Sequence, residues 1–156
     1  MEESLTYLKE QFELPDVDVK SYSPLVLAYI GDGIYELVIR TAVVGQGNRQ
    51  ANALHKKTST YVKASAQAAM MEAILEDLTE EELAVYKRGR NAKTVSMAKH
   101  ATMHDYRHAT GFEALMGYLY LTDQMERIVE LTKTALDGYH PREARYAEAR
   151  NKHRQE

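Results

Sequence analysis

The sequence predicts an all-α protein, and three observations support this prediction. Apolar residues recur at spacings of three and four instead of alternating strictly, which is the periodicity of helices. Only three prolines, at positions 15, 24 and 141, interrupt the 156 residues, so long helices fit between them. With 44% hydrophobic residues, the chain has enough apolar material for one compact domain with a sizeable core.

The first long helix has a clear start. Ser23 can cap its first turn with a hydroxyl, and Pro24 fits the first helical position, where no amide hydrogen is needed. This helix is expected to run to about Val44, with a turn over residues 45–48. A second long helix is expected over residues 49–77.

The second half of the chain carries similar signals. Thr79 and Glu82 form a capping box at the start of a third helix, which is expected to fray near Gly89. Gly138 is expected to terminate the last core helix in the left-handed conformation. We therefore predict one folded domain over residues 1–138 and a charged C-terminal tail, helical or flexible, over residues 139–156. The remaining segments are expected to form a basic loop and two helices, over residues 90–99, 103–121 and 123–136.

The composition excludes several classes of protein. Because the chain has no cysteine, a disulfide framework, a thiolate metal site and a cysteine nucleophile are all excluded. No apolar run approaches the roughly 18 residues of a membrane-spanning helix, and the start of the chain lacks the features of a signal peptide. We expect a cytoplasmic protein with no membrane partner. The net charge of -3 argues against a broadly basic nucleic-acid binder, although it allows a local basic patch.

An acidic residue stands in the middle of a strongly apolar helix. Residues 25–39 are apolar almost all the way round, as in a helix at the centre of a domain, yet they include Asp32. A buried carboxylate needs a partner, a hydrogen-bond network or a metal. Gly31 and Gly33 flank it, and glycines in a helix commonly mark the close approach of another backbone or a ligand. A packing glycine beside a hydrogen-bonded aspartate is the alternative.

The same anomaly recurs in a second apolar helix. Residues 111–121 are almost continuously apolar and carry one acid, Glu113. If the two helices pack together, Asp32 and Glu113 can converge on one divalent ion, and hard carboxylate ligands favour Mg²⁺, with Mn²⁺ as a possible substitute. Glu36, one turn after Asp32, could be a third ligand or a residue of the second coordination shell, and a salt bridge to a neighbouring arginine would explain it equally well.

Four segments in order resemble a known family. Residues 30–32, Ile-Gly-Asp, and residues 112–117, Phe-Glu-Ala-Leu-Met-Gly, resemble the two signature helices of ribonuclease III catalytic domains. Residues 87–93 and 106–121 resemble Mini-ribonuclease III, the short bacterial form that lacks a double-stranded-RNA-binding domain. The resemblance covers about residues 24–138.

The resemblance implies a fold, an activity and a partner. It implies a helical bundle that forms a homodimer, with one acidic site per subunit holding the metal through Asp32 and Glu113. It further implies an endoribonuclease that cuts both strands of double-stranded RNA, leaves 5′-phosphates and matures the large-subunit (23S) ribosomal RNA precursor. The sequence departs from full-length ribonuclease III at Ala28 and Thr110, where that enzyme has two further acids. This puts a full two-metal site in doubt and leaves open one ion, or a second ion recruited by RNA phosphate.

A basic segment is the candidate RNA-binding element. It places five cations in thirteen residues without an acid, and Asn91 among them could contact a 2′-hydroxyl group. A solvated basic loop is the alternative. The five cations are Lys87, Arg88, Arg90, Lys93 and Lys99. A second basic stretch is better explained as a solvated helix face, and it contains His55, Lys56, Lys57 and Lys63.

Other assignments compete with this one. His104 and Asp105 form an HD dipeptide of the kind seen in metal-dependent phosphohydrolases, with His100 and His108 at four-residue spacing and with His55 and Asp123 as further candidate ligands. A non-catalytic RNA-binding or scaffolding dimer of the same fold is the second alternative. Tyr29, Tyr35 and Met116 could line a dimer interface, although core packing is the simpler explanation for each.

Overall fold

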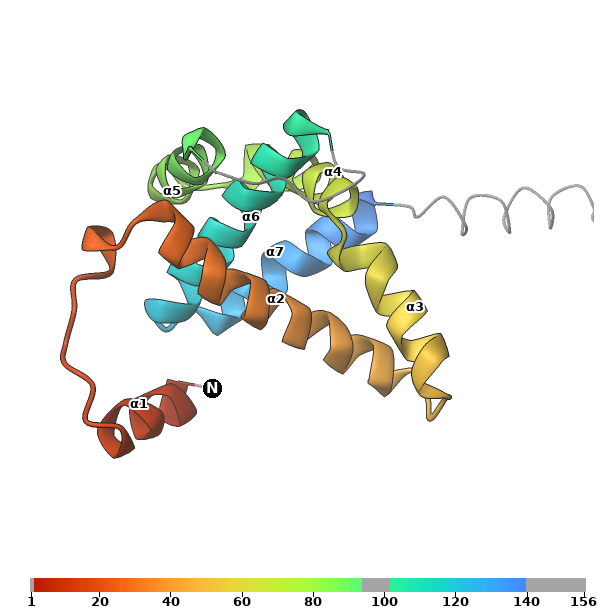
Figure 1. Ribbon diagram of the computed structural model, residues 1–156, viewed down its shortest axis with the longest axis horizontal. Helices are drawn as coiled ribbons and strands as arrows, with labels where there is room; N and C mark the ends of the chain where they lie inside the picture. Colours follow the sequence, from red (N-terminus) through yellow and green to blue (C-terminus); the bar gives the residue numbers. More distant parts are fainter. Residues whose placement is uncertain (1, 94–101, 140–156) are drawn as a thin grey trace, which may run out of the picture.

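The computed structural model describes residues 2–93 and 102–139 (Figure 1). These residues form α-helices and two short 3-10 helices, with no strand among them, which confirms the prediction of an all-α fold. The α-helices are α1 (Glu2–Gln11), α2 (Pro24–Gly45), α3 (Ala51–Val62), α4 (Ala64–Ile74), α5 (Glu80–Asn91), α6 (Met103–Leu121) and α7 (Met125–Gly138). The 3-10 helices are η1 (Val19–Ser21) and η2 (Leu75–Asp77).

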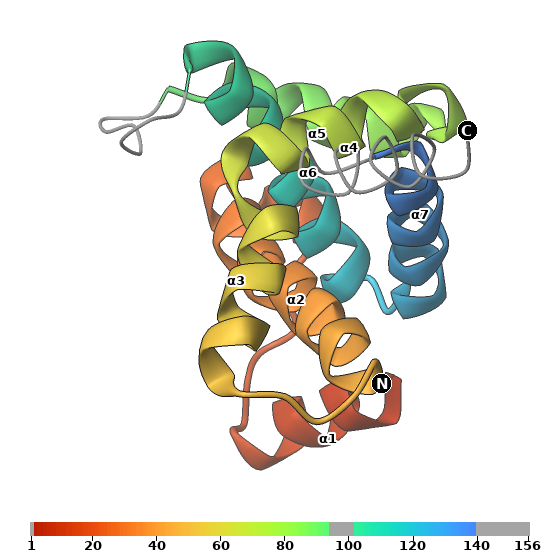
Figure 2. The ribbon, with the colours of Figure 1, turned by 90° about the vertical axis from the view of Figure 1, so that its right-hand side faces the viewer.

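Helix α6 is the centre of the bundle. Helices α2, α4 and α5 pack around it, and α7 packs on α4 and α6 (Figures 1 and 2). Every residue from Ala109 to Leu119 is buried except Glu113, which is partly buried. The core therefore encloses the helix that carries the second candidate acid. Within residues 2–93 and 102–139, no helix has the length and hydrophobicity that crossing a bilayer would require.

Two helix starts follow the local sequence signals. The Ser23 hydroxyl accepts a hydrogen bond from the amide of Val26, and Pro24 is the first residue of α2. Thr79 and Glu82 form both halves of the capping box at the start of α5. Both predictions are confirmed, because the caps depend only on neighbouring residues.

The prediction of one continuous helix over residues 49–77 is wrong. The chain leaves helical geometry at Lys63, whose backbone is extended, so α3 and α4 are separate. The carbonyl groups freed at the end of α3 find partners on other helices or further along the chain. The Gln67 amide donates to the Val62 carbonyl at 2.8 Å, and the Tyr35 hydroxyl donates to the Tyr61 carbonyl at 2.6 Å. The break is thus stabilised by side chains that local periodicity does not report.

Two glycines have roles other than those predicted. Helix α5 continues through Gly89 to Asn91, because Gly89 is buried against α6, where a Cβ atom would come within 2.9 Å of the Gly111 Cα. Gly138 lies within α7 and does not adopt positive φ, so it is not a left-handed terminator. A Cβ atom at Gly138 would come within 2.8 Å of the Ala73 Cβ, so close packing on α4 accounts for the glycine.

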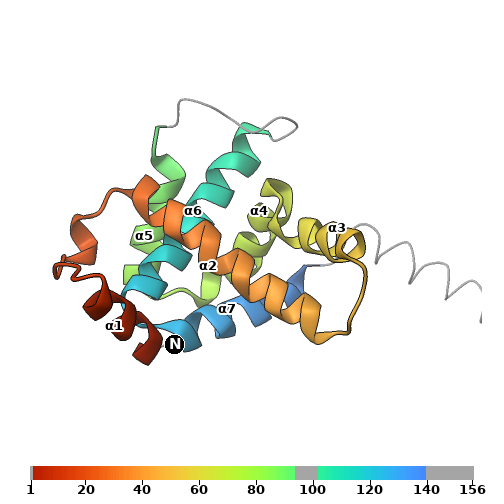
Figure 3. The same cartoon turned by 60° about the horizontal axis from the view of Figure 1, so that its bottom comes forward.

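The N-terminal helix stands apart from the bundle. Helix α1 is joined to α2 by a long connection and lies beside the bundle instead of within it (Figures 1 and 3). Among residues 4–11, Leu5 is the only buried side chain. Apolar side chains of this arm stay exposed, including Tyr7, Phe12 and Leu14.

Candidate active site

Helices α2 and α6 cross with their backbones in direct contact, and two glycines permit this. A Cβ atom at Gly31 would overlap the carbonyl oxygen of Glu113 and lie 2.7 Å from the amide nitrogen of Gly117. A Cβ atom at Gly117 would overlap the carbonyl oxygen of Leu27. Any other residue at either position would push the helices apart, as residues with a side chain do when an interior is already close-packed.

The crossing brings the two candidate acids together. Asp32 follows Gly31 on α2, and Glu113 belongs to the turn of α6 that touches Gly31. Each of the two sequence-predicted acids therefore comes from one of the two helices at their closest point. The sequence predicted that Asp32 and Glu113 lie close together if their two helices pack against each other. The structure shows that α2 and α6 pack in this way.

The expected burial of Asp32 is wrong, whereas Glu113 is partly buried. The sequence suggested that α2 is covered all the way round, but one face of this helix is open. Tyr29 is 83% exposed and Leu37 is 53% exposed, while Tyr35 on the opposite face is fully buried. Asp32 lies at the edge of the covered face, so one acid faces solvent and the other faces inward.

The electrostatics of the pair favour proton uptake when no metal is bound. Burial, followed by the negative charge of Asp32, raises the pKa of Glu113 to about 8. Desolvation, followed by the charge of Glu36, raises the pKa of Asp32 above its usual value. Neither carboxylate has a hydrogen bond or an ion pair to any of the residues that the structure describes. Among the described residues, no basic side chain is therefore paired with Asp32 or Glu113.

Glu36 is held by an arginine. The Arg40 Nε and Nη2 groups donate to Glu36 Oε1 at 3.2 and 2.8 Å, one helical turn apart on α2. Within the described ranges, no group of three or more His, Asp or Glu side chains is arranged to hold a metal ion. Asp32 and Glu113 remain the candidate pair of carboxylates at the crossing. The salt bridge to a neighbouring arginine, which the sequence left open as the alternative for Glu36, is therefore formed, with Arg40 as the partner.

The two positions that lack acids are filled by packing. Ala28 is buried on α2, and Thr110 is buried on α6 with its hydroxyl donating to the Tyr106 carbonyl at 2.9 Å. Neither side chain can supply a metal ligand of the kind a carboxylate provides.

The basic segment begins on the last turns of α5. Lys87, Arg88, Asn91 and Lys93 are exposed, and Arg90 is partly buried with its guanidinium 5.6 Å from the centre of the Tyr86 ring. Arg90 also donates to the Asn91 side chain at 3.3 Å. The predicted basic loop therefore starts two residues later than expected, because Arg90 and Asn91 are helical. Lys99 lies outside the described residues.

The competing histidine site is not assembled in the described part of the chain. His104 stacks against His108, whose ring nitrogen pairs with the Tyr86 hydroxyl, and Asp105 contacts only its neighbour His104 among the candidates. His55 and Asp123 lie on other elements and do not join them. His100 lies outside the described residues. The histidines of α6 stabilise the packing between α5 and α6.

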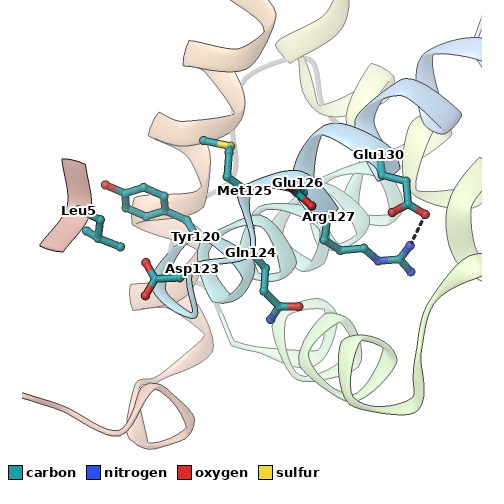
Figure 4. A pocket seen from close by; sticks show the side chains of 8 residues that line it. All are labelled: Leu5, Tyr120, Asp123, Gln124, Met125, Glu126, Arg127 and Glu130. Carbon is teal, nitrogen blue, oxygen red and sulfur yellow. Dashed lines mark hydrogen bonds and ion pairs between the residues drawn. The ribbon is translucent and has the colours of Figure 1, made fainter. Parts of the chain in front are cut away.

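A cavity of about 680 Å³ lies elsewhere, at the turn between α6 and α7 (Figure 4). Leu5 of α1 and Tyr120 of α6 lie at one end of it, and Arg127 of α7 lies at the other (Figure 4). Arg127 is committed there, because it pairs with the buried Glu82 at 2.8 Å and with Glu130 at 2.9 Å. The cavity includes neither Asp32 nor Glu113.

Comparison with known proteins agrees with the geometry of the α2 and α6 crossing. The family model described as Ribonuclease III domain matches residues 25–124, which contain both acids. The chain belongs to the ribonuclease III family. The matched segment leaves out α1, which the structure also sets apart from the bundle.

Curated relatives of this ribonuclease III protein carry a more specific name. Mini-ribonuclease 3 of Clostridium tetani is 47% identical over 134 residues, covering 85% of this chain and 87% of the relative. Mini-ribonuclease 3 of Enterococcus faecalis is 54% identical over 116 residues, covering 73% and 88% of the two chains. A crystal structure of a Fusobacterium nucleatum protein superposes with a TM-score of 0.70 at 33% identity, covering 79% of this chain and 98% of that one. The resemblance to the short form of the family is confirmed.

Proposed function

We propose that this endoribonuclease cleaves double-stranded RNA as a homodimer, with Asp32 and Glu113 of each subunit holding a catalytic Mg²⁺ ion. The observation that carries the proposal is the pair of carboxylates at the α2 and α6 crossing, which has no cation among the described residues. The substrate proposed is the large-subunit (23S) ribosomal RNA precursor, the role that the short form of the family suggests. We place the enzyme with that substrate in the cytoplasm.

The two acids fit a hard divalent ion. They offer only oxygen ligands, and the elevated pKa of both shows that each would gain from a nearby positive charge. Mn²⁺ shares these preferences and is expected to substitute. A divalent ion supplies stabilisation of the charge on the phosphate oxygens and activation of water near neutral pH. Two ligands leave most of its coordination sites to water and phosphate.

The side chains of the protein have two further roles, to hold the ion and to bind the RNA. Glu113 would hold the ion in its ionised form, and Asp32 would do so from the exposed edge of the crossing. The cationic end of α5 holds phosphates of the duplex, through Lys87, Arg88, Arg90 and Lys93, with Asn91 available to a 2′-hydroxyl group and Lys99 following in the chain. The nucleophile would be water: its attack at phosphorus, with cleavage of the bond to the 3′-oxygen and protonation of that oxygen, would give 5′-phosphate and 3′-hydroxyl ends.

Cleavage of a long RNA duplex tests the activity directly. Wild-type protein is incubated with Mg²⁺, with Mn²⁺ or with EDTA, and the products are resolved on a denaturing gel. The proposal expects double-strand cleavage with either metal and none with EDTA, and 5′-phosphates that a phosphate-dependent 5′-exonuclease recognises. Binding of the duplex without cleavage under all three conditions would favour the non-catalytic scaffold instead.

Metal affinity is predicted to depend on pH through Glu113. Because its pKa is about 8 without metal, the ion must displace a proton at lower pH. The apparent affinity for Mn²⁺ should rise by up to about tenfold per pH unit between pH 6 and 8 and level off above that. Titration calorimetry across this range, with the exposed α7 variant Asp137→Asn as a control for surface charge, measures the slope. A flat profile for the wild type would show that Glu113 is not a ligand.

The exposed apolar face of α2 is the proposed dimer interface. Val26, Tyr29 and Leu37 point away from the core, and Gly33 between them has nothing within 4 Å of the place a Cβ atom would occupy. The proposed interface ends at Leu37 and leaves the last two turns of α2, from Arg40 onward, outside it. A second copy of this chain is the occupant proposed, because a two-fold pairing here places two sites on antiparallel RNA strands. Tyr35 and Met116 are fully buried within one chain, so core packing explains both. Of the three interface candidates that the sequence suggested, Tyr29 is therefore the one that remains.

Tyr29→Arg should disrupt this dimer. Burying an unpaired charge in an apolar interface costs several kcal/mol, so the dissociation constant should rise about 100-fold or more. Analytical ultracentrifugation over a concentration series gives that constant. Val129→Arg is the matched control, since Val129 is an exposed apolar residue on α7 that the interface does not use. Equal weakening by both variants would remove the assignment of this face.

We propose that the catalytic domain ends at Gly138 and that the tail begins at residue 139, because α7 ends at Gly138. Residues 140–156 lie outside the described part of the chain.

A further inference from the structure

An oriented arginine lies beside the proposed site on the surface of α2. Asp32, Glu36 and Arg40 follow one another at four-residue intervals, so they form a row along one side of the helix. Arg40 donates through Nε and Nη2 to the same oxygen of Glu36, at 3.2 and 2.8 Å. About half of the Arg40 side chain (53%) is exposed to solvent. Its Nη1 group has no partner among the described residues, so the guanidinium presents a free edge.

Stability alone is a weak explanation for this pair. An exposed pair one turn apart on a helix contributes a few tenths of a kcal/mol. What the pair does achieve is to fix the direction of a guanidinium that would otherwise sample many rotamers.

The surroundings of Arg40 are suited to an anion. Arg40 of α2 lines a recess of about 140 Å³, and His55 and Thr58 of α3 line its other side. These side chains carry hydrogen-bond donors, and the remaining lining of the recess is apolar.

The charge pattern of the sequence points the same way. After Glu36 the next acid is Glu72, so residues 37–71 contain none of the 23 Asp and Glu residues of a chain with net charge -3. The same stretch carries five of its 20 Lys and Arg residues: Arg40, Arg49, Lys56, Lys57 and Lys63. Residues 37–71 therefore contain no carboxylate that would compete with an external anion for Arg40.

We propose that Arg40, oriented by Glu36, binds a phosphate of the RNA strand that passes through the proposed metal site. This inference rests on the proposed function of Asp32 and Glu113. Eight residues separate Asp32 from Arg40, about 12 Å along the helix axis. Arg40 therefore contacts a phosphate a few nucleotides from the one that is cleaved. Arg40 is a substrate-binding residue, and Glu36 is a positioning residue that acts through it.

The first test measures RNA binding without chemistry. A fluorescein-labelled RNA duplex is titrated with wild type, Arg40→Gln and Lys133→Gln in EDTA, at several salt concentrations, and binding is followed by fluorescence anisotropy. Arg40→Gln should weaken binding about tenfold and reduce the slope of log K against log salt by about one per subunit. Lys133→Gln removes the same charge from the exposed face of α7 and should stay within about twofold of wild type, as a non-specific effect of net charge would.

The second test separates orientation from simple charge. If Glu36 acted only as a negative charge near the RNA, both Glu36→Ala and Glu36→Gln would tighten binding. If it positions Arg40, Glu36→Ala should raise KM several-fold, and Glu36→Gln should restore part of the loss, because an amide oxygen can still accept from the guanidinium. In both variants kcat should change less than KM, since Arg40 lies away from the reacting phosphate.

The outcomes distinguish this inference from the proposed function. Normal duplex binding by the wild type together with unchanged binding by Arg40→Gln would overturn the Arg40 assignment and leave the proposed function intact. Tighter binding by Glu36→Ala would overturn the positioning role. Failure of the wild type to bind or cut duplex RNA would overturn the proposed function and this inference with it.

Discussion

Asp32→Asn and Glu113→Gln should each lower the rate of duplex cleavage by at least about 1,000-fold, the largest effects on activity that we expect. Each replacement keeps the shape of the side chain and removes one of the two carboxylate ligands. With only two such ligands in the described site, the loss of one leaves the ion bound by a single protein carboxylate. The effect should therefore appear in kcat and in the Mg²⁺ concentration that gives half-maximal rate.

Rates are measured under single-turnover conditions over a wide range of Mg²⁺. Asp137→Asn is the control, because it removes one negative charge from an exposed position on α7 and should leave the rate unchanged. If high Mg²⁺ restored wild-type rates to either variant, the residue would contribute only to metal affinity. If either variant kept wild-type rates at low Mg²⁺, that acid would have no role in the site.

The same Glu113→Gln variant should make the metal-free protein more stable at high pH. A carboxyl whose pKa is raised in the folded state contributes stability below its unfolded pKa, and this stability is lost as pH rises through the folded value. For Glu113 the window runs from its usual value of 4.5 up to about 8. Above pH 8 the wild type should therefore be less stable than Glu113→Gln by a few kcal/mol.

Urea unfolding of the wild type and of Glu113→Gln, in EDTA at pH 5 and at pH 9, tests whether the variant gains stability while it loses activity. The difference between the two proteins should be small at pH 5 and large at pH 9. A variant that loses both cleavage and stability at pH 9 would show that Glu113 serves the fold, for instance through an ion pair. Loss of cleavage with a gain in stability is the signature of a residue kept for chemistry.

Sequence reasoning succeeded where the signal is local or costly. Ser23 and Pro24 fix the start of α2 through their own backbone and side-chain chemistry, so the structure agrees with them. Asp32 and Glu113 were singled out because an acid in an apolar helix needs a reason, and the structure brings both to one crossing. The chemistry of single residues was enough for these predictions.

Sequence reasoning failed where tertiary contacts decide. The break at Lys63 depends on the side chains of Tyr35 and Gln67, which lie outside the local helix pattern. The exposure of Asp32 depends on an apolar face of α2 that the other described residues leave uncovered. Apolar periodicity indicates that a helix face is buried, but it does not indicate whether the same chain or a second copy buries it. The exposed apolar face of α2, which we propose as the dimer interface, was for this reason expected to lie in the core.

Gly117→Ala should destabilise the protein by about 3 kcal/mol or more, one of the two largest effects on stability that we expect from one added methyl group, together with Gly31→Ala. The new Cβ atom would overlap the Leu27 carbonyl oxygen and lie 2.8 Å from the Leu27 carbonyl carbon, and both are helix backbone that cannot rotate away. The two helices must therefore move apart. In any folded fraction the separation of Asp32 and Glu113 would grow as well, so cleavage should fall beyond what the loss of folded protein explains.

Gly45→Ala is the matched control, because Gly45 also lies in α2 and has nothing within 4 Å of the position of its Cβ atom. Alanine is the better helix former, so this variant should be as stable as the wild type or slightly more stable. Chemical unfolding of the three proteins gives the comparison. If Gly117→Ala unfolded at the same denaturant concentration as Gly45→Ala, the contact between α2 and α6 would be loose. The site would then need another explanation for how two acids on different helices stay within reach of one ion, since it is this backbone contact that holds them together.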